Sequence, residues 1–231
     1  MNDSSNTDSE LTLDPPGSIA IVGAGTHGIE AGIYGRFLGY DVTILEQGSI
    51  GNNMRMESGA DLVVLPDQCL SPLGLSAVEA QHAAENPGSM PRVHPSTVSA
   101  WVEEGLIPLS KSDLLRGRVK TDHRVSSIDT IAIELENESE DPSDYPADFQ
   151  LHYTDSAGVK GTFRAESVLV ATGSQCGIEF KFPLPFPYLY RIESTSHHDA
   201  AGLLAGRRQI VEIYSQLAGR ADLDLYRPPR V

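Results

Sequence analysis

The sequence predicts an α/β protein built on a parallel sheet, and three observations support this expectation. A short run rich in β-branched residues, Ser18 to Val22, has the composition of a strand that a parallel sheet buries on both faces. Glycines follow it, then apolar residues at helical spacing from Ile29 to Leu38, then a second strand-like run, Asp41 to Leu45. From Arg124 onward the apolar pattern changes to period two, which predicts a small antiparallel β-meander beside the parallel sheet.

Composition and charge narrow the classes of protein. The 231 residues are enough for one large domain, or for one domain and a fragment of another. A net charge of −15 repels nucleic-acid backbones and anionic membranes, so we expect neither as a partner. The apolar runs are strand-sized and the polar opening segment lacks the features of a secretory signal, so we expect a cytoplasmic protein.

Cysteine and histidine patterns predict neither a redox pair nor a metal site. Cys69 and Cys176 are far apart in the sequence and form no CxxC motif, so we expect two buried thiols. The run His197-His198-Asp199 has no third ligand at a suitable spacing, and adjacent residues rarely point at one ion. We therefore expect surface histidines and no metal.

The remaining elements follow from local pattern. Residues 1–17 are polar and rich in proline, which predicts a disordered tail. The long stretch from Gly48 to Pro91 has weak periodicity and is expected to be mostly loop. Helices are expected over Ser96 to Glu104 and over Ser110 to Leu115.

The meander is expected to have short strands separated by polar connections. The strands are predicted at Ile128 to Ile133, Asp148 to Thr154 and Gly161 to Arg164, with a turn at residues 155–158. Between the first two strands lies an acidic run, Glu134 to Ala147, which is typical of a solvated loop.

The sharpest motif follows the first strand directly and opens the first helix. In a G-x-G-x-x-G turn the first glycine permits the bend, the second lets the backbone approach a pyrophosphate, and the third allows close packing of helix on strand. The helix N-terminus then meets the anion with its N–H groups. We expect His27 to flank the phosphates and not to act as an acid or base. The residues expected to bind a dinucleotide here are Gly23, Ala24, Gly25, Thr26, His27 and Gly28.

An acidic residue at the end of the second strand strengthens this prediction. The Glu46 carboxylate can accept hydrogen bonds from both ribose hydroxyls of a dinucleotide, and Gln47 follows it. A 2′-phosphate would meet a like charge there, which disfavours NADP at this site. FAD and NAD remain as candidates.

A second motif distinguishes between these two cofactors. The segment Thr162 to Gly173 ends in Ala171-Thr172-Gly173, and it resembles the segment that closes the FAD domain of flavoproteins with two dinucleotide sites. The chain is similar over Ser18 to Gly173 to flavin-containing monooxygenase-like, N-hydroxylase-like and thioredoxin-reductase-like oxidoreductases. The resemblance implies a Rossmann-like FAD-binding domain over residues 18–175, with Ala171, Thr172 and Gly173 near the cofactor.

The same resemblance assigns a role to the segment after the second strand. Gly51 to Met56 lies where such proteins pass the isoalloxazine ring, which implies a cofactor contact for Arg55. Family members often have a tryptophan here, where this chain has Glu57-Ser58-Gly59. Ser71 to Gly74 resembles a turn that follows this region in some monooxygenase-like members.

Residues 176–231 are expected to form a partial, degenerate NAD(P)-binding segment, a fragment of a second Rossmann unit. Its strands are predicted at Arg207 to Val211 and Asp222 to Tyr226, on either side of a helix from Glu212 to Ala218. The glycine-rich turn between Val211 and Glu212 is absent, so we expect a truncated or internally deleted chain in which NAD(P)H has no working site.

Three functional hypotheses remain open from the sequence. The first is an FAD-binding oxidoreductase-like protein of the monooxygenase or NAD(P)H-dependent reductase class. The second is a non-catalytic dinucleotide-binding or regulatory protein, and the third is an NAD-dependent enzyme without flavin. The catalytic residues, the small-molecule substrate and the oligomeric state are not predicted.

Overall fold

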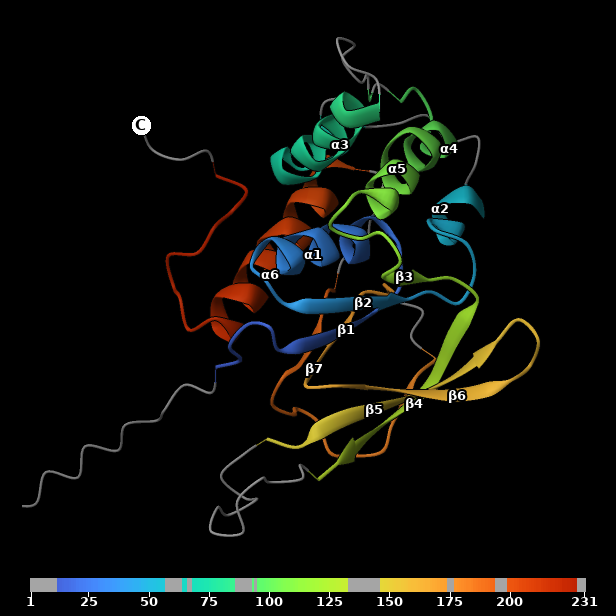
Figure 1. Ribbon diagram of the computed structural model, residues 1–231, viewed down its shortest axis with the longest axis vertical. Coiled ribbons are helices and arrows are strands. Elements are labelled where there is room, and N and C mark those ends of the chain that lie inside the picture. Colours follow the sequence, from blue (N-terminus) through green and yellow to red (C-terminus); the bar gives the residue numbers. More distant parts are fainter. Residues whose placement is uncertain are drawn as a thin grey trace, which may run out of the picture.

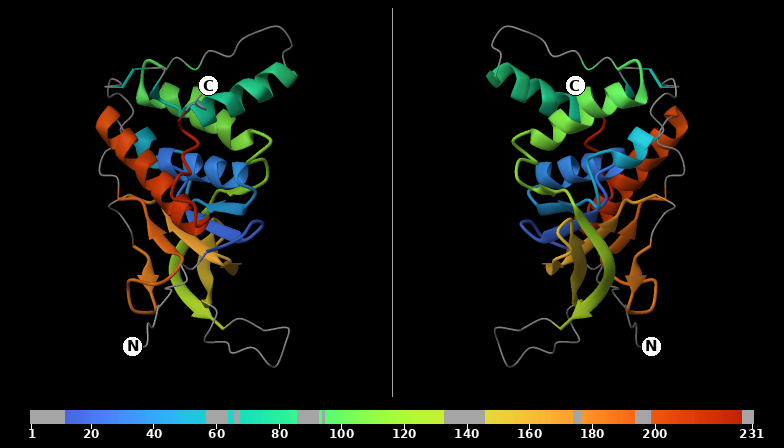
Figure 2. Two further views of the ribbon diagram at one scale, coloured as in Figure 1. Left: turned by 90° about the vertical axis from the view of Figure 1, so that its left-hand side faces the viewer. Right: turned by 90° about the vertical axis from the view of Figure 1, so that its right-hand side faces the viewer.

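The computed structural model describes residues 12–56, 64–65, 68–85, 93, 95–132, 146–173, 177–193 and 199–227. In this part of the chain, a parallel sheet lies between a layer of helices and a second, smaller sheet (Figure 1). The side views show the same three layers, with the C-terminal helix beside the first helix (Figure 2). The expected α/β fold is confirmed.

The main sheet is parallel throughout. Its strand order is β3-β2-β1-β7-β9, so the carboxyl ends of all five strands lie at one edge. Residues of the first strand, such as Ile19 and Ile21, are almost fully buried because helices cover one face and the second sheet covers the other. The strands are β1 (Ser18–Val22), β2 (Asp41–Leu45), β3 (Val119–Lys120), β7 (Ser167–Val170) and β9 (Leu189–Arg191).

The helical layer is organised around α1, which contacts β2, α3 and α6. Helix α6 lies close to it because Gly35 leaves room for the Tyr214 ring, whose hydroxyl donates to the carbonyl oxygen of Ala31 at 2.8 Å. The helical segments are α1 (Thr26–Phe37), α2 (Asn52–Met56), α3 (Pro72–Glu85), α4 (Val98–Trp101), a π-helical turn η2 (Val102–Leu106), α5 (Ile107–Lys111) and α6 (Ala200–Leu217).

The second sheet contains the expected meander, in the order β6-β5-β4-β8. Buried side chains on β5, such as Phe149 and Leu151, contribute to the core. The period-two pattern therefore predicted the three antiparallel strands correctly. The strands are β4 (His123–Ile131), β5 (Asp148–Asp155), β6 (Lys160–Ala165) and β8 (Glu179–Phe180).

The C-terminal part of the chain does not contain the two strands that were expected there. The predicted strand Arg207 to Val211 and the predicted helix after it form one continuous helix, α6. The Asp199 side chain caps this helix by accepting from the Gly202 N–H at 2.7 Å, and the helix buries an apolar face. The absence of a glycine turn after Val211 therefore reflects an uninterrupted helix. The predicted strand Asp222 to Tyr226 was also wrong, since those residues lie in turns and irregular backbone.

Three further expectations also differ from the structure. The tail was expected to extend to residue 17, yet Leu13 is buried and its N–H donates to the carbonyl oxygen of Leu217 at 2.8 Å. The expected loop from Gly48 to Pro91 contains α2 and α3. The expected helix at Ser110 to Leu115 was misplaced, because the helical run from α4 to α5 ends at Lys111.

Some expectations concern residues outside the described part of the chain. These are Glu57 to Gly59, most of the acidic run, Cys176 and the pair His197-His198. Among the described residues, no helix combines the length and apolar character needed to span a membrane.

Candidate nucleotide-binding site

A cavity of about 420 Å³ opens at the carboxyl edge of the main sheet. Because the strands are parallel, the segments that leave β1, β2 and β7 meet at this edge, where open α/β sheets bind their ligands. The expected cofactor-binding residues that line the cavity are Gly23, Gly25, Glu46, Gln47, Ala171 and Thr172.

Two positions of the first motif are glycine for different structural reasons. Gly25 has an ordinary backbone conformation (φ −78°, ψ −173°), and a Cβ atom there would meet nothing within 4 Å. Its missing side chain therefore leaves open space beside the first turn of α1. At Gly28 a Cβ would overlap the carbonyl oxygen of Gly23, so that glycine is needed for the helix to pack against the turn.

Glu46 lines the cavity and is only 7% exposed. One oxygen accepts from the Ala24 N–H at 2.7 Å and the other from the Gly48 N–H at 2.9 Å. The carboxylate therefore ties the glycine-rich turn to the segment after β2. Since an ionised carboxylate has about four lone-pair sites, it retains acceptor capacity for ligand hydroxyls.

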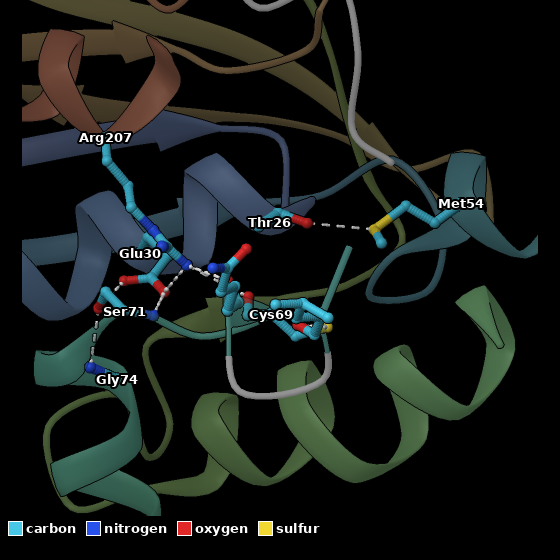
Figure 3. Close-up of polar contacts among 9 residues, drawn as sticks. Thr26, Glu30, Met54, Cys69, Ser71, Gly74 and Arg207 are labelled. Atoms are coloured by element: carbon cyan, nitrogen blue, oxygen red, sulfur yellow. Dashed lines mark hydrogen bonds and ion pairs between the residues drawn. The ribbon is translucent and has the colours of Figure 1, made fainter. Parts of the chain in front are cut away.

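Two polar groups next to the cavity bear on whether the site fits a dinucleotide. The hydroxyl of Thr172 is buried and has no hydrogen-bond partner among the residues that the structure describes. The hydroxyl of Thr26 donates to the Met54 sulfur at 3.3 Å, which fixes α2 against the start of α1 (Figure 3). Open space at Gly25, a buried acceptor at Glu46 and a hydroxyl at Thr172 fit the diphosphate and ribose of a dinucleotide.

The other expected site residues do not line the cavity. Ala24 and Thr26 are buried in the turn, and the ring of His27 packs against Gly206 of α6, away from the cavity. The expectation that His27 flanks the phosphates is therefore not met by its side chain. The Arg55 guanidinium pairs with Glu103 at 2.8 Å. The remaining expected residues outside the cavity lining are Gly28 and Gly173.

Sequence reasoning missed several residues that line the cavity. His123, Arg124 and Val125 reach it because β4 starts next to the end of β2, where the His123 N–H donates to the Glu46 carbonyl oxygen at 2.8 Å. Ile178 comes from the segment after β7. The parallel pairing of β3 with β2 was the signal that could have placed these residues, but β3 is too short to predict.

A second buried carboxylate lies within the helical layer. Glu30 of α1 is fully buried and accepts from the Ser71 N–H at 2.7 Å and from the Ser71 hydroxyl at 2.5 Å (Figure 3). The Arg207 guanidinium of α6 lies 3.9 Å from it and donates to the carbonyl oxygen of Gln68 at 3.0 Å. Burial, and then the charge of Glu30, raise the pKa of the nearby Tyr226 hydroxyl. This network joins α1, α3 and α6.

Comparisons with known proteins establish the fold. No family model matches the chain, and no curated protein matches it. The structure of THI4 from Thermovibrio ammonificans is 16% identical, with a TM-score of 0.53 over 87% of this chain and 90% of THI4. The chain has a Rossmann-type fold.

Larger proteins also appear among the similar structures. The bacillithiol disulfide reductase Bdr from Bacillus cereus is 18% identical, and the match covers 68% of this chain and 40% of that protein, with a TM-score of 0.45. The ornithine hydroxylase PvdA from Pseudomonas aeruginosa is 13% identical over 68% of this chain and 39% of its own, with a TM-score of 0.47. The chain thus spans about 40% of the length of these enzymes.

Proposed function

We propose that this chain binds FAD in the cavity at the carboxyl edge of the main sheet and serves as the FAD-binding part of an oxidoreductase of the monooxygenase or NAD(P)H-dependent reductase class. The observation that carries the proposal is the pairing of open space at Gly25 with the buried Glu46 carboxylate on the next strand. The turn at Ala171 to Gly173 supports FAD over NAD, through its resemblance to flavoprotein segments.

Each residue group has a distinct task in this proposal. The first turn of α1 offers backbone N–H groups and the positive end of the helix dipole to the diphosphate. Glu46 accepts hydrogen bonds from the ribose hydroxyls while it holds the glycine-rich turn in place. The Thr172 hydroxyl donates to the ligand from the other side of β1. A bound flavin would supply the hydride and electron chemistry.

The test of this proposal is to identify the cofactor. The full chain is purified under native conditions, denatured, and the released compound is identified by chromatography and mass spectrometry. We expect FAD, or, if the chain purifies without cofactor, saturable binding of added FAD with one site per chain. A chain that releases no nucleotide and binds neither FAD nor ADP would contradict the proposal.

A second candidate function is dinucleotide binding without turnover. It is favoured by α6, because the residues expected to begin an NAD(P)H site form instead a helix packed on α1. Asp222 to Tyr226 likewise lie in turns and irregular backbone and do not form the second strand of such a site.

Anaerobic stopped-flow reduction distinguishes the two candidates. The chain loaded with FAD is mixed with NADH or NADPH, and flavin absorbance is followed. Bleaching at about 1 s⁻¹ or faster, a rate typical of enzyme turnover, would support the reductase class. Much slower reduction by both nucleotides would support binding without turnover by this chain alone.

A further inference from the structure

A groove of about 310 Å³, separate from the nucleotide cavity, lies on the second sheet. Residues of β4, β5 and β6 line it, together with Lys181, which follows β8. The described lining includes four serine or threonine residues and two lysines, but no aspartate or glutamate. Such a lining is unexpected in a chain with a net charge of −15, and the proposed function makes no use of it.

The strand register gathers hydrogen-bond donors at one end of this groove. Lys160 of β6 is paired with Thr154 of β5, and Thr162 is paired with His152. Side chains directly opposite each other in an antiparallel pair share a face, about 5 Å apart at Cβ, and so do residues two apart along a strand. These four side chains therefore form a compact array on the face opposite the buried Leu151.

Three groups of this array are available to a ligand. In the part of the chain that the structure describes, no protein acceptor is bonded to the Thr154 hydroxyl, the Thr162 hydroxyl or the Lys160 ammonium. A phosphate group presents three or four acceptor oxygens in a tetrahedral arrangement, whereas a carboxylate presents two in one plane. Donors at three corners of an array therefore fit a phosphate better than a carboxylate.

The acidic side chains near the groove already have partners. Asp129 accepts from the Lys181 ammonium at 3.0 Å and faces Nε2 of His152 at 2.9 Å. Asp155 accepts from two backbone N–H groups of the turn between β5 and β6. The charge of Lys181 is thus balanced by Asp129, while Lys160 has no ion-pair partner among the described residues. The excess positive charge lies at the threonine end of the groove.

An irregularity of β4 adds further hydroxyls to the groove. The register between β4 and β5 shifts between Val125 and Ser127, so Ser126 is an extra residue, and its hydroxyl donates to the His152 carbonyl oxygen at 3.3 Å. Both Ser126 and Ser127 line the groove, although consecutive residues of a regular strand point to opposite faces. Such bulges are frequent next to functional sites because they redirect side chains.

We propose that this groove binds a phosphate group, either free or carried by a small hydroxylated compound, through Lys160, Thr154 and Thr162. Lys160 supplies the charge and the two threonines supply hydroxyl donors. The serines of the bulge are placed to contact the remainder of a phosphorylated compound. The site does not depend on the nucleotide cavity, which is lined by other residues.

Nuclear magnetic resonance titration of the full, isotopically labelled chain tests the proposal. Inorganic phosphate is added at constant ionic strength, because weak binding of an anion to surface cations is screened by salt. We expect saturable shifts of the amide signals of Gly161 and Thr162. Glycerol 3-phosphate should shift the same signals; tighter binding than that of inorganic phosphate would assign the site to a phosphate ester, and equal or weaker binding would assign it to free phosphate.

Two variants measure the contribution of the named donors. Lys160→Gln and Thr162→Val should each weaken phosphate binding at the groove by about tenfold, since each removes one hydrogen bond to a charged group. Both side chains are exposed, so the fold should not change. The matched control is Lys111→Gln on α5, an exposed lysine outside the groove, which should change the affinity by less than about twofold.

Gly25→Val separates this site from the nucleotide cavity. This variant should keep phosphate binding at Gly161 and Thr162, whatever its effect on FAD. Phosphate-induced shifts confined to the first turn of α1 would overturn the proposal and leave the nucleotide site intact. Equal losses in Lys160→Gln and Lys111→Gln would also overturn it, by showing only a general attraction to positive charge. Binding of succinate as tight as that of phosphate would overturn the assignment to a phosphate group.

Discussion

Two buried carboxylates near the start of α1 lie in opposite environments. At its first turn, Glu46 lies on a cavity and is bonded only to backbone N–H groups. One turn further, Glu30 is sealed between α3 and α6 and is held by Ser71 and Arg207 (Figure 3). The Glu46 carboxylate therefore keeps lone pairs that a ligand in the cavity can reach, whereas the lone pairs of Glu30 are used by groups of the protein itself.

This difference separates the residues that bind a nucleotide from those that stabilise the fold around the start of α1. Changes at Gly25 should reduce nucleotide affinity and leave the fold intact. Changes at Glu30 should lower the free energy of unfolding and leave the affinity of the folded protein unchanged. A Gly25 variant with a less stable fold, or a folded Glu30 variant with weaker nucleotide binding, would contradict this separation of roles.

The largest effect is expected for Glu30→Ala. Removing this carboxylate leaves Arg207 without its ion-pair partner and leaves the buried Ser71 hydroxyl and N–H without acceptors. We expect the free energy of unfolding to fall by about 3 kcal/mol or more. Urea unfolding followed by circular dichroism measures this change.

A matched control for that variant is available on the surface. Glu103 is also paired with an arginine, but its side chain is 54% exposed. Glu103→Ala should change the free energy of unfolding by less than about 1 kcal/mol. Equal losses from the two variants would show that the Glu30 network is no more important than a surface pair.

The next effect is a loss of binding in Gly25→Val. The backbone at Gly25 is compatible with any side chain, and nothing in the described structure would clash with a Cβ there, so the fold should persist. The branched side chain would fill the space assigned to the diphosphate, and we expect at least about a 100-fold loss of FAD affinity. Fluorescence titration with FAD measures it.

Gly28→Ala is the contrasting variant at the same turn. Its Cβ would overlap the Gly23 carbonyl oxygen, so we expect a less stable protein and not a selective loss of affinity. If Gly25→Val proved as unstable as Gly28→Ala, the assignment of open space at Gly25 to a ligand would lose its basis.

The smallest effect is expected for Glu46→Gln. The amide keeps the shape of the side chain but loses the charge and one acceptor oxygen, so binding of FAD should weaken by about 1–3 kcal/mol. Calorimetry gives this difference directly. The conservative change Glu30→Gln should leave the affinity unaltered, and an equal loss in both variants would contradict the separation of roles.

The sequence predicted the first strand-helix-strand unit and the meander because their signals are local. The glycine motif from Gly23 to Gly28 can bind a dinucleotide only between a strand and a helix, so it also predicts those two elements. The alternation of apolar and polar residues in β4 to β6 reflects one buried face of the sheet. The six predicted residues that line the cavity belong to the segments that directly follow β1, β2 and β7, where local motifs mark them.

The errors have a physical cause in tertiary packing. The run Arg207 to Val211 looks like a strand in isolation, yet Leu203, Ile210 and Tyr214 form one face of a helix that packs on α1. His123 was missed because it enters the cavity through the pairing of β3 with β2, which no local pattern reveals.

Hydrogen–deuterium exchange with and without ADP shows where on the molecule the nucleotide binds. We predict that ADP slows exchange of the backbone amides at the start of α1, from Gly25 to Ile29, and around Glu46, with little change across α6. Protection confined to the outer face of the second sheet, near Lys160 and Lys181, would contradict the account, because those residues line a separate groove.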